Sequence, residues 1–210
     1  MDFNTVQEFE QQVANFFGAP YGIAVDSCTH GVELCLRRRC AESTAQKPLV
    51  VAIPKRTYIS IPFLAGKLNL PWHWKDEDWV DYYELGNTKI YDAAVLWKKD
   101  SYIDGTFMCL SFQFQKHLSL GRGGMILTDN KKAKEELKKM SYDGRDPNTP
   151  WREQNINMVG YHYYMTPEIA AKGLEKLPKA IETKPKQWHV LDWPDLSKMD
   201  VFIDPYLQTR

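Results

Sequence analysis

The sequence lacks an excess of either charge and lacks the usual spacing of metal ligands. Lys plus Arg and Asp plus Glu both number 27, so the formal net charge is zero. A neutral chain offers no electrostatic basis for binding nucleic acid or an anionic membrane surface. None of the four cysteines forms a CxxC pair, and no histidine cluster stands beside them at metal-ligand spacing. We therefore expect no metal site and free thiols, as in a reducing cytoplasm.

The sequence also has no long apolar run, internal repeat or low-complexity segment. No run approaches membrane-spanning length, and the opening MDFNTVQEFEQQ is too polar and acidic for a signal peptide. We expect a soluble, cytoplasmic protein, and we attribute most of its seven tryptophans to an unusually aromatic surface, with aromatic stacking as the alternative. A chain of 210 residues can bury one core. Because periodicity is lost from Glu182 on, we predict one domain over residues 1–181 and an irregular tail over residues 182–210.

Apolar runs alternate with helical patterns along most of the chain. The first helix is expected from Val6 to Phe17, with Asn4 or Thr5 as its cap and Gly18 as its stop. Apolar strands without alternation, separated by helices, predict an α/β fold with a mostly parallel sheet and helices on both faces. The strand candidates are 21–25, 49–53, 89–91, 107–112 and 125–128, and further helices are expected after 26–31, at 131–140 and at 167–177.

Two early segments carry candidate binding features. AVDSCTHGVELCL (24–36) leads from a strand through a turn of small residues into a helix. The start of such a helix presents unpaired N–H groups and a positive dipole end, which suit a phosphate, although an ordinary capped helix has the same pattern. In IPKRTYISIP, Tyr58 follows a strand and can stack on a flat aromatic ligand, or it is a core or surface residue.

Two later segments carry candidate chemistry. KIYDAAVLW places Asp92 at the end of a short apolar strand, where a carboxylate pairs with a protonated pyridine nitrogen or caps a following helix. SFQFQKHLSLGRGGMILTD (111–129) has the pattern strand, lysine-bearing loop, glycine-rich turn, strand. Desolvation of Lys116 in that loop lowers its pKa and makes it a nucleophile toward an aldehyde, whereas the alternative is a solvated surface charge. GRGG is no dinucleotide-binding fingerprint, because no helix follows it.

Taken in order, these segments resemble the DegT/DnrJ/EryC1/StrS family, the pyridoxal-phosphate-dependent sugar aminotransferases with the type I aspartate aminotransferase fold. The resemblance begins at FEQQVANFFGAPYGIAV, continues through SCTHG, YDAA and SFQFQK, and ends at VGYHYYMTPEIAAKGLEKL. It implies pyridoxal 5′-phosphate (PLP) as the cofactor. It also implies that the chain is a shortened member that corresponds to the large domain, with the small domain missing and the stretch between Trp74 and Tyr91 reduced.

The resemblance also implies the roles of individual residues. Lys116 is the Schiff-base lysine, Asp92 is the partner of the pyridine nitrogen, and Tyr58 is the ring that stacks on the cofactor. The cofactor phosphate is held by residues of three segments, and one of them reaches the site of the neighbouring subunit, so a homodimer with a shared active site is expected. These phosphate residues are Ser111, Thr29, His30 and, across the dimer, His162, which replaces an Asn of the family.

The implied activity is transfer of an amino group from an amino acid such as glutamate to a nucleotide-linked keto-sugar. The alternative is a PLP-binding or partner-binding protein without transaminase activity. Val95, where the family has Gln or His, Arg122 in place of an acidic residue, and Tyr164 in place of Arg depart from the family pattern. A related sugar dehydratase is disfavoured, because those members carry His where this chain has Lys116.

Overall fold

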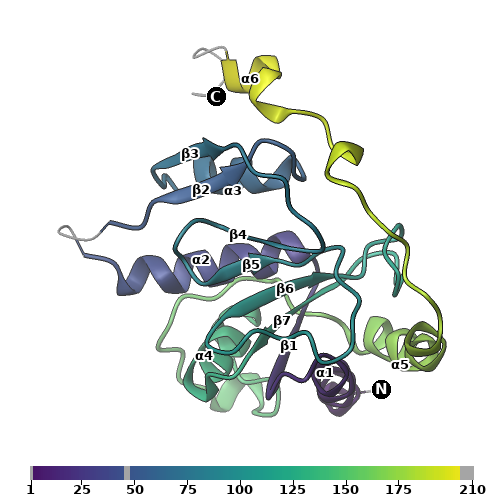
Figure 1. Cartoon of the computed structure of the whole chain (residues 1–210). Coiled ribbons are helices and arrows are strands. Elements are labelled where there is room, and N and C mark those ends of the chain that lie inside the picture. The colour runs from purple at the N-terminus through teal and green to yellow at the C-terminus, as the bar shows by residue number, and fades with distance from the viewer. Residues whose placement is uncertain (1, 45–47, 204–210) are drawn as a thin grey trace.

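The structure is a computed structural model that describes residues 2–44 and 48–203. Its main sheet has five strands in the order β1-β7-β6-β5-β4, and a second sheet pairs β2 with β3 (Figure 1). The strands are β1 (Tyr21–Val25), β2 (Val51–Pro54), β3 (Trp72–Lys75), β4 (Tyr83–Glu84), β5 (Ile90–Asp92), β6 (Phe107–Ser111) and β7 (Gly124–Thr128). The longer helices are α1 (Phe3–Phe17), α2 (Cys28–Glu42), α3 (Ser60–Lys67), α4 (Lys131–Ser141) and α5 (Pro167–Glu182).

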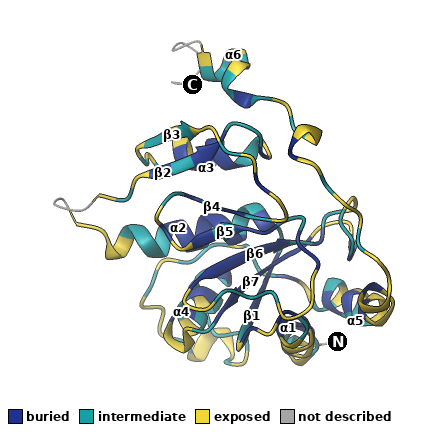
Figure 2. Cartoon of the chain, in the orientation of Figure 1, coloured by how far each residue is buried: buried dark blue, intermediate teal, exposed yellow. Residues whose placement is uncertain are grey.

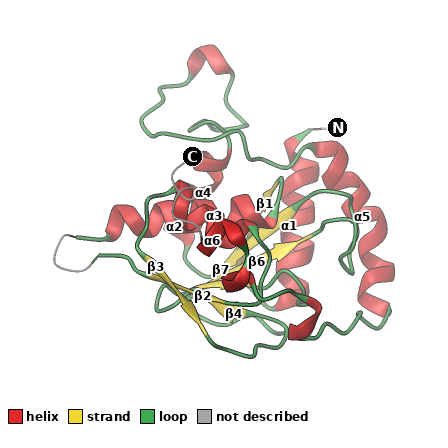
Figure 3. Ribbon diagram, turned by 90° about the horizontal axis from the view of Figure 1, so that it is seen from above, coloured by secondary structure: helices red, strands yellow, loops and turns green. Residues whose placement is uncertain are grey.

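Helices cover both faces of the main sheet. The helices α1 and α5 lie together on one face, and α2 and α4 lie on the other (Figures 1 and 3). Successive residues of β6 point to opposite faces, so Met108 packs with α1 and α5 while Cys109 packs with α2. Both faces of the central strands are buried (Figure 2), which explains why their sequences are apolar throughout. The predicted α/β class is confirmed.

The predicted strand direction is wrong, because the main sheet is mixed rather than mostly parallel. Only β5 and β6 pair in parallel, whereas β7 runs antiparallel to both β1 and β6, and β4 runs antiparallel to β5. Apolar runs identify buried strands but carry no information on direction. The loop from Phe112 to Gly123 returns the chain directly beside β6, which makes β7 antiparallel.

The stretch before Tyr91, which the resemblance implies to be reduced, lies at the edge of the main sheet. Strand β4 has only two residues, and the chain turns back from it into β5. The edge strand of the main sheet therefore runs antiparallel to its neighbour. The parallel pair β2 and β3 forms a sheet of its own. Both sheets nevertheless contribute to one core, since Ile53 of β2 and Ile90 of β5 are buried in the same cluster.

Several element boundaries agree with the sequence, and some elements were missed. The strand β1 has the predicted bounds, and α1 ends at Gly18, whose φ of 78° is the left-handed conformation typical of a helix stop. The cap of α1 is Asp2 rather than Asn4 or Thr5, because its carboxylate accepts a hydrogen bond from the Asn4 amide. The elements α3, β3 and β4 were not predicted.

The C-terminal segment crosses the molecule and packs against it. After α5 it passes over the end of the main sheet to the second sheet, where the short helix α6 (Asp200–Ile203) lies (Figures 1 and 3). Val190 and Leu196 are buried, and the Leu196 amide donates a 2.8 Å hydrogen bond to the Lys55 carbonyl. The division into a domain and a tail stays a prediction. None of the helices in the described ranges combines the length and the hydropathy of a membrane-spanning segment.

Candidate active site

A cavity of about 220 Å³ opens at the carboxyl ends of β1, β2, β5 and β6. Ligands bind preferentially at this edge of an α/β sheet. Five of the seven predicted site residues meet there although their segments are far apart in the sequence. These five are Thr29, Tyr58, Asp92, Ser111 and Lys116.

Asp92 is a buried carboxylate on the cavity wall. One oxygen, Oδ2, accepts a 2.7 Å hydrogen bond from the Tyr83 hydroxyl, and the other accepts a 3.0 Å bond from the Ala94 amide. Burial raises the pKa of Asp92, and the bond from Tyr83 opposes that rise. Residues 93–106, directly after Asp92, contain no helix, so the capping alternative reduces to the single bond from Ala94.

Lys116 enters the cavity from the loop between β6 and β7. Its side chain is half-buried, and its Nζ lies 4.8 Å from the centre of the Trp188 ring. Burial lowers the pKa of Lys116, while the negative charge of Asp92 acts in the opposite direction. A larger fraction of neutral amine is therefore present than on a solvated lysine, as a nucleophile requires.

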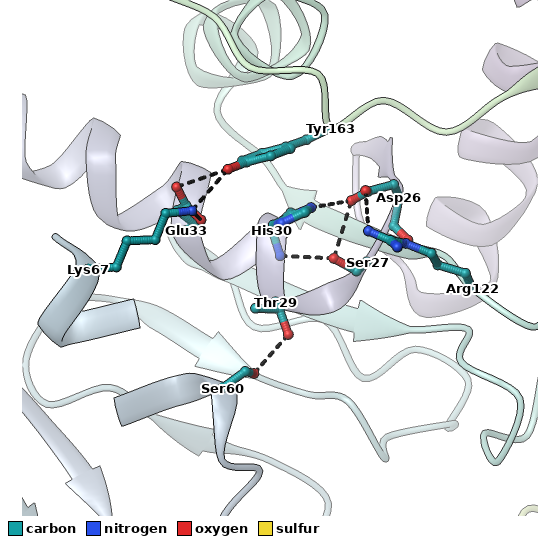
Figure 4. Close-up of polar contacts among 9 residues, drawn as sticks. All are labelled: Asp26, Ser27, Thr29, His30, Glu33, Ser60, Lys67, Arg122 and Tyr163. Atoms are coloured by element: carbon teal, nitrogen blue, oxygen red, sulfur yellow. Dashed lines mark hydrogen bonds and ion pairs between the residues drawn. The ribbon is translucent and has the colours of Figure 1, made fainter. Parts of the chain in front are cut away.

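The start of α2 forms the polar end of the cavity (Figure 4). Ser27 caps the helix by accepting a 3.2 Å hydrogen bond from the His30 amide, and Thr29 Oγ1 lies 2.8 Å from Ser60 Oγ. The glycine-rich turn explains this geometry, since a Cβ on Gly124 would lie 2.5 Å from the backbone nitrogen of Cys28. Only glycine lets β7 begin this close to the helix.

Two neighbours of this helix start, His30 and Arg122, lie differently from what the sequence led us to expect (Figure 4). The ring of His30 pairs with Asp26 and stacks on Tyr163 at 3.6 Å, and His30 is not among the residues that line the cavity. Arg122, which the sequence marked only as a departure from a family pattern, does line the cavity and bonds Asp26 at 2.7 Å. The Arg122 guanidinium therefore stands at the polar end of the cavity, a position that was not predicted from the sequence.

His162 lies outside the cavity on the surface. Its side chain is 73% exposed, and its Nδ1 lies 2.9 Å from the Asp143 carboxylate. A residue that serves a neighbouring subunit must be exposed in the single chain. Its role at a partner's phosphate stays a prediction.

Four aromatic residues of the cavity wall were not recognised in the sequence. Tyr83 and Trp79 come from the stretch between Trp74 and Tyr91, and Trp188 and Trp193 come from the C-terminal segment. Their rings form a continuous series, with Trp193 4.9 Å from Trp79 and 5.3 Å from Trp188. The high tryptophan content was a signal, but it had been attributed to the surface.

The sequence of the chain matches a known family. A profile of the DegT/DnrJ/EryC1/StrS aminotransferase family matches residues 1–66 and 103–192, which is more than half of the chain. The chain belongs to the DegT/DnrJ/EryC1/StrS family. The profile leaves out residues 67–102, so the place of Asp92 in this family member rests on the structure.

Relatives of this family member are longer than the chain itself. MJ1066, an uncharacterized protein of Methanocaldococcus jannaschii, is 24% identical over 82% of this chain and 56% of its own length. CalS13, a sugar aminotransferase from Micromonospora echinospora, has the same fold (TM-score 0.70, 16% identity, 85% of this chain and 61% of CalS13). A GDP-4-keto-6-deoxymannose-3-dehydratase that holds PLP with glutamate also has this fold, with a TM-score of 0.65 and 16% identity. The match covers 84% of this chain and 61% of the dehydratase. The chain spans less than two thirds of each.

Family membership confirms the predicted cofactor, PLP, and the cavity residues fit it. A half-buried amine and a buried carboxylate suit its aldehyde and its ring nitrogen, respectively. The hydroxyls of Thr29, Ser60 and Ser111 gather with the helix start where a phosphate group needs donors. The polar, apolar and charged walls therefore correspond to the parts of one flat, phosphorylated ligand.

Proposed function

We propose that this protein transfers an amino group from an amino acid such as glutamate to a nucleotide-linked keto-sugar. The observation that carries the proposal is the meeting of Lys116 and Asp92 in one cavity, each with its pKa displaced by burial. Displaced pKa values on a lysine and a carboxylate that share a cavity are typical of a catalytic pair. Family membership supplies the reaction class.

Lys116 and Asp92 would take part in the chemical steps of the reaction. When bound, PLP supplies an aldehyde that condenses with amines and a conjugated ring that takes up the electron pair left on the amino carbon. Lys116 is the amine that would attach the cofactor and then carry the proton between the two reacting carbons. Asp92 would hold the proton on the ring nitrogen, because a carboxylate buried beside it favours the protonated ring.

The remaining cavity residues would bind and orient. Thr29, Ser111 and the start of α2 would hold the phosphate, with Arg122 as the nearby cation, and Tyr58 would lie on the cofactor ring. Tyr58 is 60% exposed, so it stands at the mouth of the cavity, where an incoming ring reaches it. His162 would complete the phosphate site of a second subunit, which makes a homodimer the proposed assembly.

Borohydride trapping tests the attachment of the cofactor. The protein loaded with PLP should be yellow, lose its colour on reduction, and carry the reduced cofactor on the peptide that contains Lys116. Lys116→Ala should remove the adduct. Lys186 is the matched control, since it lies at the same tryptophan, with its Nζ 3.8 Å from the Trp188 ring, but is exposed. Lys186→Gln should retain the adduct, and an adduct on Lys186 in the parent protein would refute the assignment.

Addition of an amino donor separates turnover from binding. In an aminotransferase, glutamate should convert the yellow form in a single half-reaction that Lys116→Ala abolishes. The rival proposal, a PLP-binding protein without turnover, has support in the cavity wall, because Val95 offers no hydrogen bond to a bound ligand. A yellow protein that no amino donor converts would establish the rival.

A further inference from the structure

The cavity has an outer wall that belongs to the C-terminal segment. Trp188 and Trp193 line it together with residues of the sheet edge. Trp188 lies over the Nζ of Lys116 at 4.8 Å, and its ring is also within 3.8 Å of the Lys186 Nζ. The segment therefore contacts the amine on which the reaction depends, and it does so with the face of an aromatic ring.

Contacts beyond Trp188 hold this segment in place. The Arg56 guanidinium donates a 2.7 Å hydrogen bond to the Trp193 carbonyl, and the Trp79 indole donates a 2.8 Å bond to the Arg56 carbonyl. Beyond the cavity, Leu196 is 1% exposed and Phe202 packs on Trp74 at 5.2 Å. The segment is thus fastened at its far end, while Trp188 itself is only half-buried.

We propose that residues 184–198 form a cover over the cavity and that Trp188 is a positioning residue, which excludes water from Lys116 and sets the path of the substrate to it. The proposed cover follows from the geometry alone, whereas the proposed role of Trp188 toward the substrate rests on the proposed function. A ring at this place favours a substrate with an apolar ring face, because such a face can lie against the indole.

A purely structural role for Trp188 makes a different prediction. If Trp188 only anchored the segment, its removal would lower stability without opening the cavity. The native Cys28 distinguishes the two roles, because its thiol lines the cavity floor and is buried. Cys40 is half-buried outside the cavity and serves as the internal reference in the same sample.

The experiment is alkylation by iodoacetamide, followed by mass spectrometry of each cysteine peptide. In the protein without cofactor, Trp188→Ala should raise the rate of alkylation at Cys28 about tenfold. This factor corresponds to a decrease of about 1.4 kcal/mol in the free energy needed to open the cover. The rate at Cys40 should not change. Trp188→Phe keeps an aromatic ring and should restore most of the protection.

Two further variants keep the test decisive. Leu191→Ala alters an exposed side chain of the same segment, 64% exposed, and should leave both rates unchanged. Arg56→Met removes the bond to Trp193 without altering the cavity wall and should also speed the reaction at Cys28. Equal Cys28 rates in the parent, Trp188→Ala and Arg56→Met would overturn the cover.

Release of PLP from the loaded protein supplies the second readout. Trp188→Ala should release the cofactor several-fold faster than the parent and Leu191→Ala. If the parent binds PLP and Trp188→Ala releases it at the parent rate, the positioning role is wrong although the proposed function stands. If the parent binds no PLP, the proposed function and the positioning role toward the substrate are both wrong, while the rates at Cys28 still decide the cover.

Discussion

The hydrogen bond from Tyr83 to Asp92 should dominate the energetics of the buried carboxylate. Tyr83→Phe removes the 2.7 Å bond to Asp92 Oδ2 and also the hydroxyl that contacts Thr57. A hydrogen bond to a charged group contributes about 1.5–3 kcal/mol. Its loss should therefore raise the pKa of Asp92 further above the ordinary value for an aspartate, because the bond from Tyr83 opposes the effect of burial.

The sign of the pH dependence follows from the raised pKa. Because burial raises the pKa of Asp92 in the folded state, the folded protein binds the proton more tightly, and stability falls as pH rises through that pKa. In Tyr83→Phe the loss of folding stability with rising pH should be larger by about 1.5–3 kcal/mol. The loss should be complete once the pH exceeds the pKa of Asp92 in this variant. Urea unfolding of the cofactor-free protein should therefore show a midpoint lower by about 1 M at alkaline pH and a smaller difference in acid.

Two comparisons would expose an error in this reasoning. Tyr91→Phe removes a longer bond, 3.3 Å, to the half-buried Glu84 and should cost less than about 1 kcal/mol. In an Asp92→Asn background, Tyr83→Phe should lose its pH dependence, because no carboxylate remains to titrate. A pH-independent loss in the parent background, or the same pH dependence in both backgrounds, would refute the assignment to Asp92.

Three further predictions concern stability and assembly. Lys138→Met leaves Glu10 buried without its partner and should cost about 3–5 kcal/mol; because burial raises the pKa of Glu10, unfolding measurements should show a smaller loss in acid. Gly124→Ala forces a Cβ against Cys28 and should cost about 1–3 kcal/mol while weakening PLP binding, as thermal melts and PLP titration would reveal. Sedimentation should show a dimer that PLP strengthens, and a PLP-loaded monomer would exclude the shared site.

The sequence predicted those parts of the fold that depend on local patterns. The bounds of β1 and the end of α1 follow from an apolar run and from Gly18, and both are local signals. Strand β3 was missed because WHWK is only half-buried and lies in a small separate sheet. Helix α3 was missed because no side chain caps its start and Pro62 and Gly66 interrupt its pattern.

The site was predicted where a family motif could be transferred and missed where contacts are specific to this chain. Lys116, Asp92 and Thr29 stand at positions that the motifs mark, and the structure brings them to one cavity. The contact of Trp188 with Lys116 joins segments that are distant in sequence, so no local periodicity contains it. The position of Arg122 at the cavity, and of His30 outside its lining, depends on the Asp26 and Tyr163 contacts, which only the fold assembles.

The ribosome synthesises the residues of the C-terminal cover after the residues of the cavity that they cover. Every cavity residue of the sheet edge and helix start precedes Gly124, whereas Trp188 and Trp193 are synthesised after them. At about 5–20 residues per second, translation leaves an interval of seconds in which the earlier segments can fold before the tryptophans leave the ribosome. During that interval the cavity is open on the side that the cover later occupies. A nascent chain could thus take up its cofactor through the open side, and the proposed cover would then close the cavity around it.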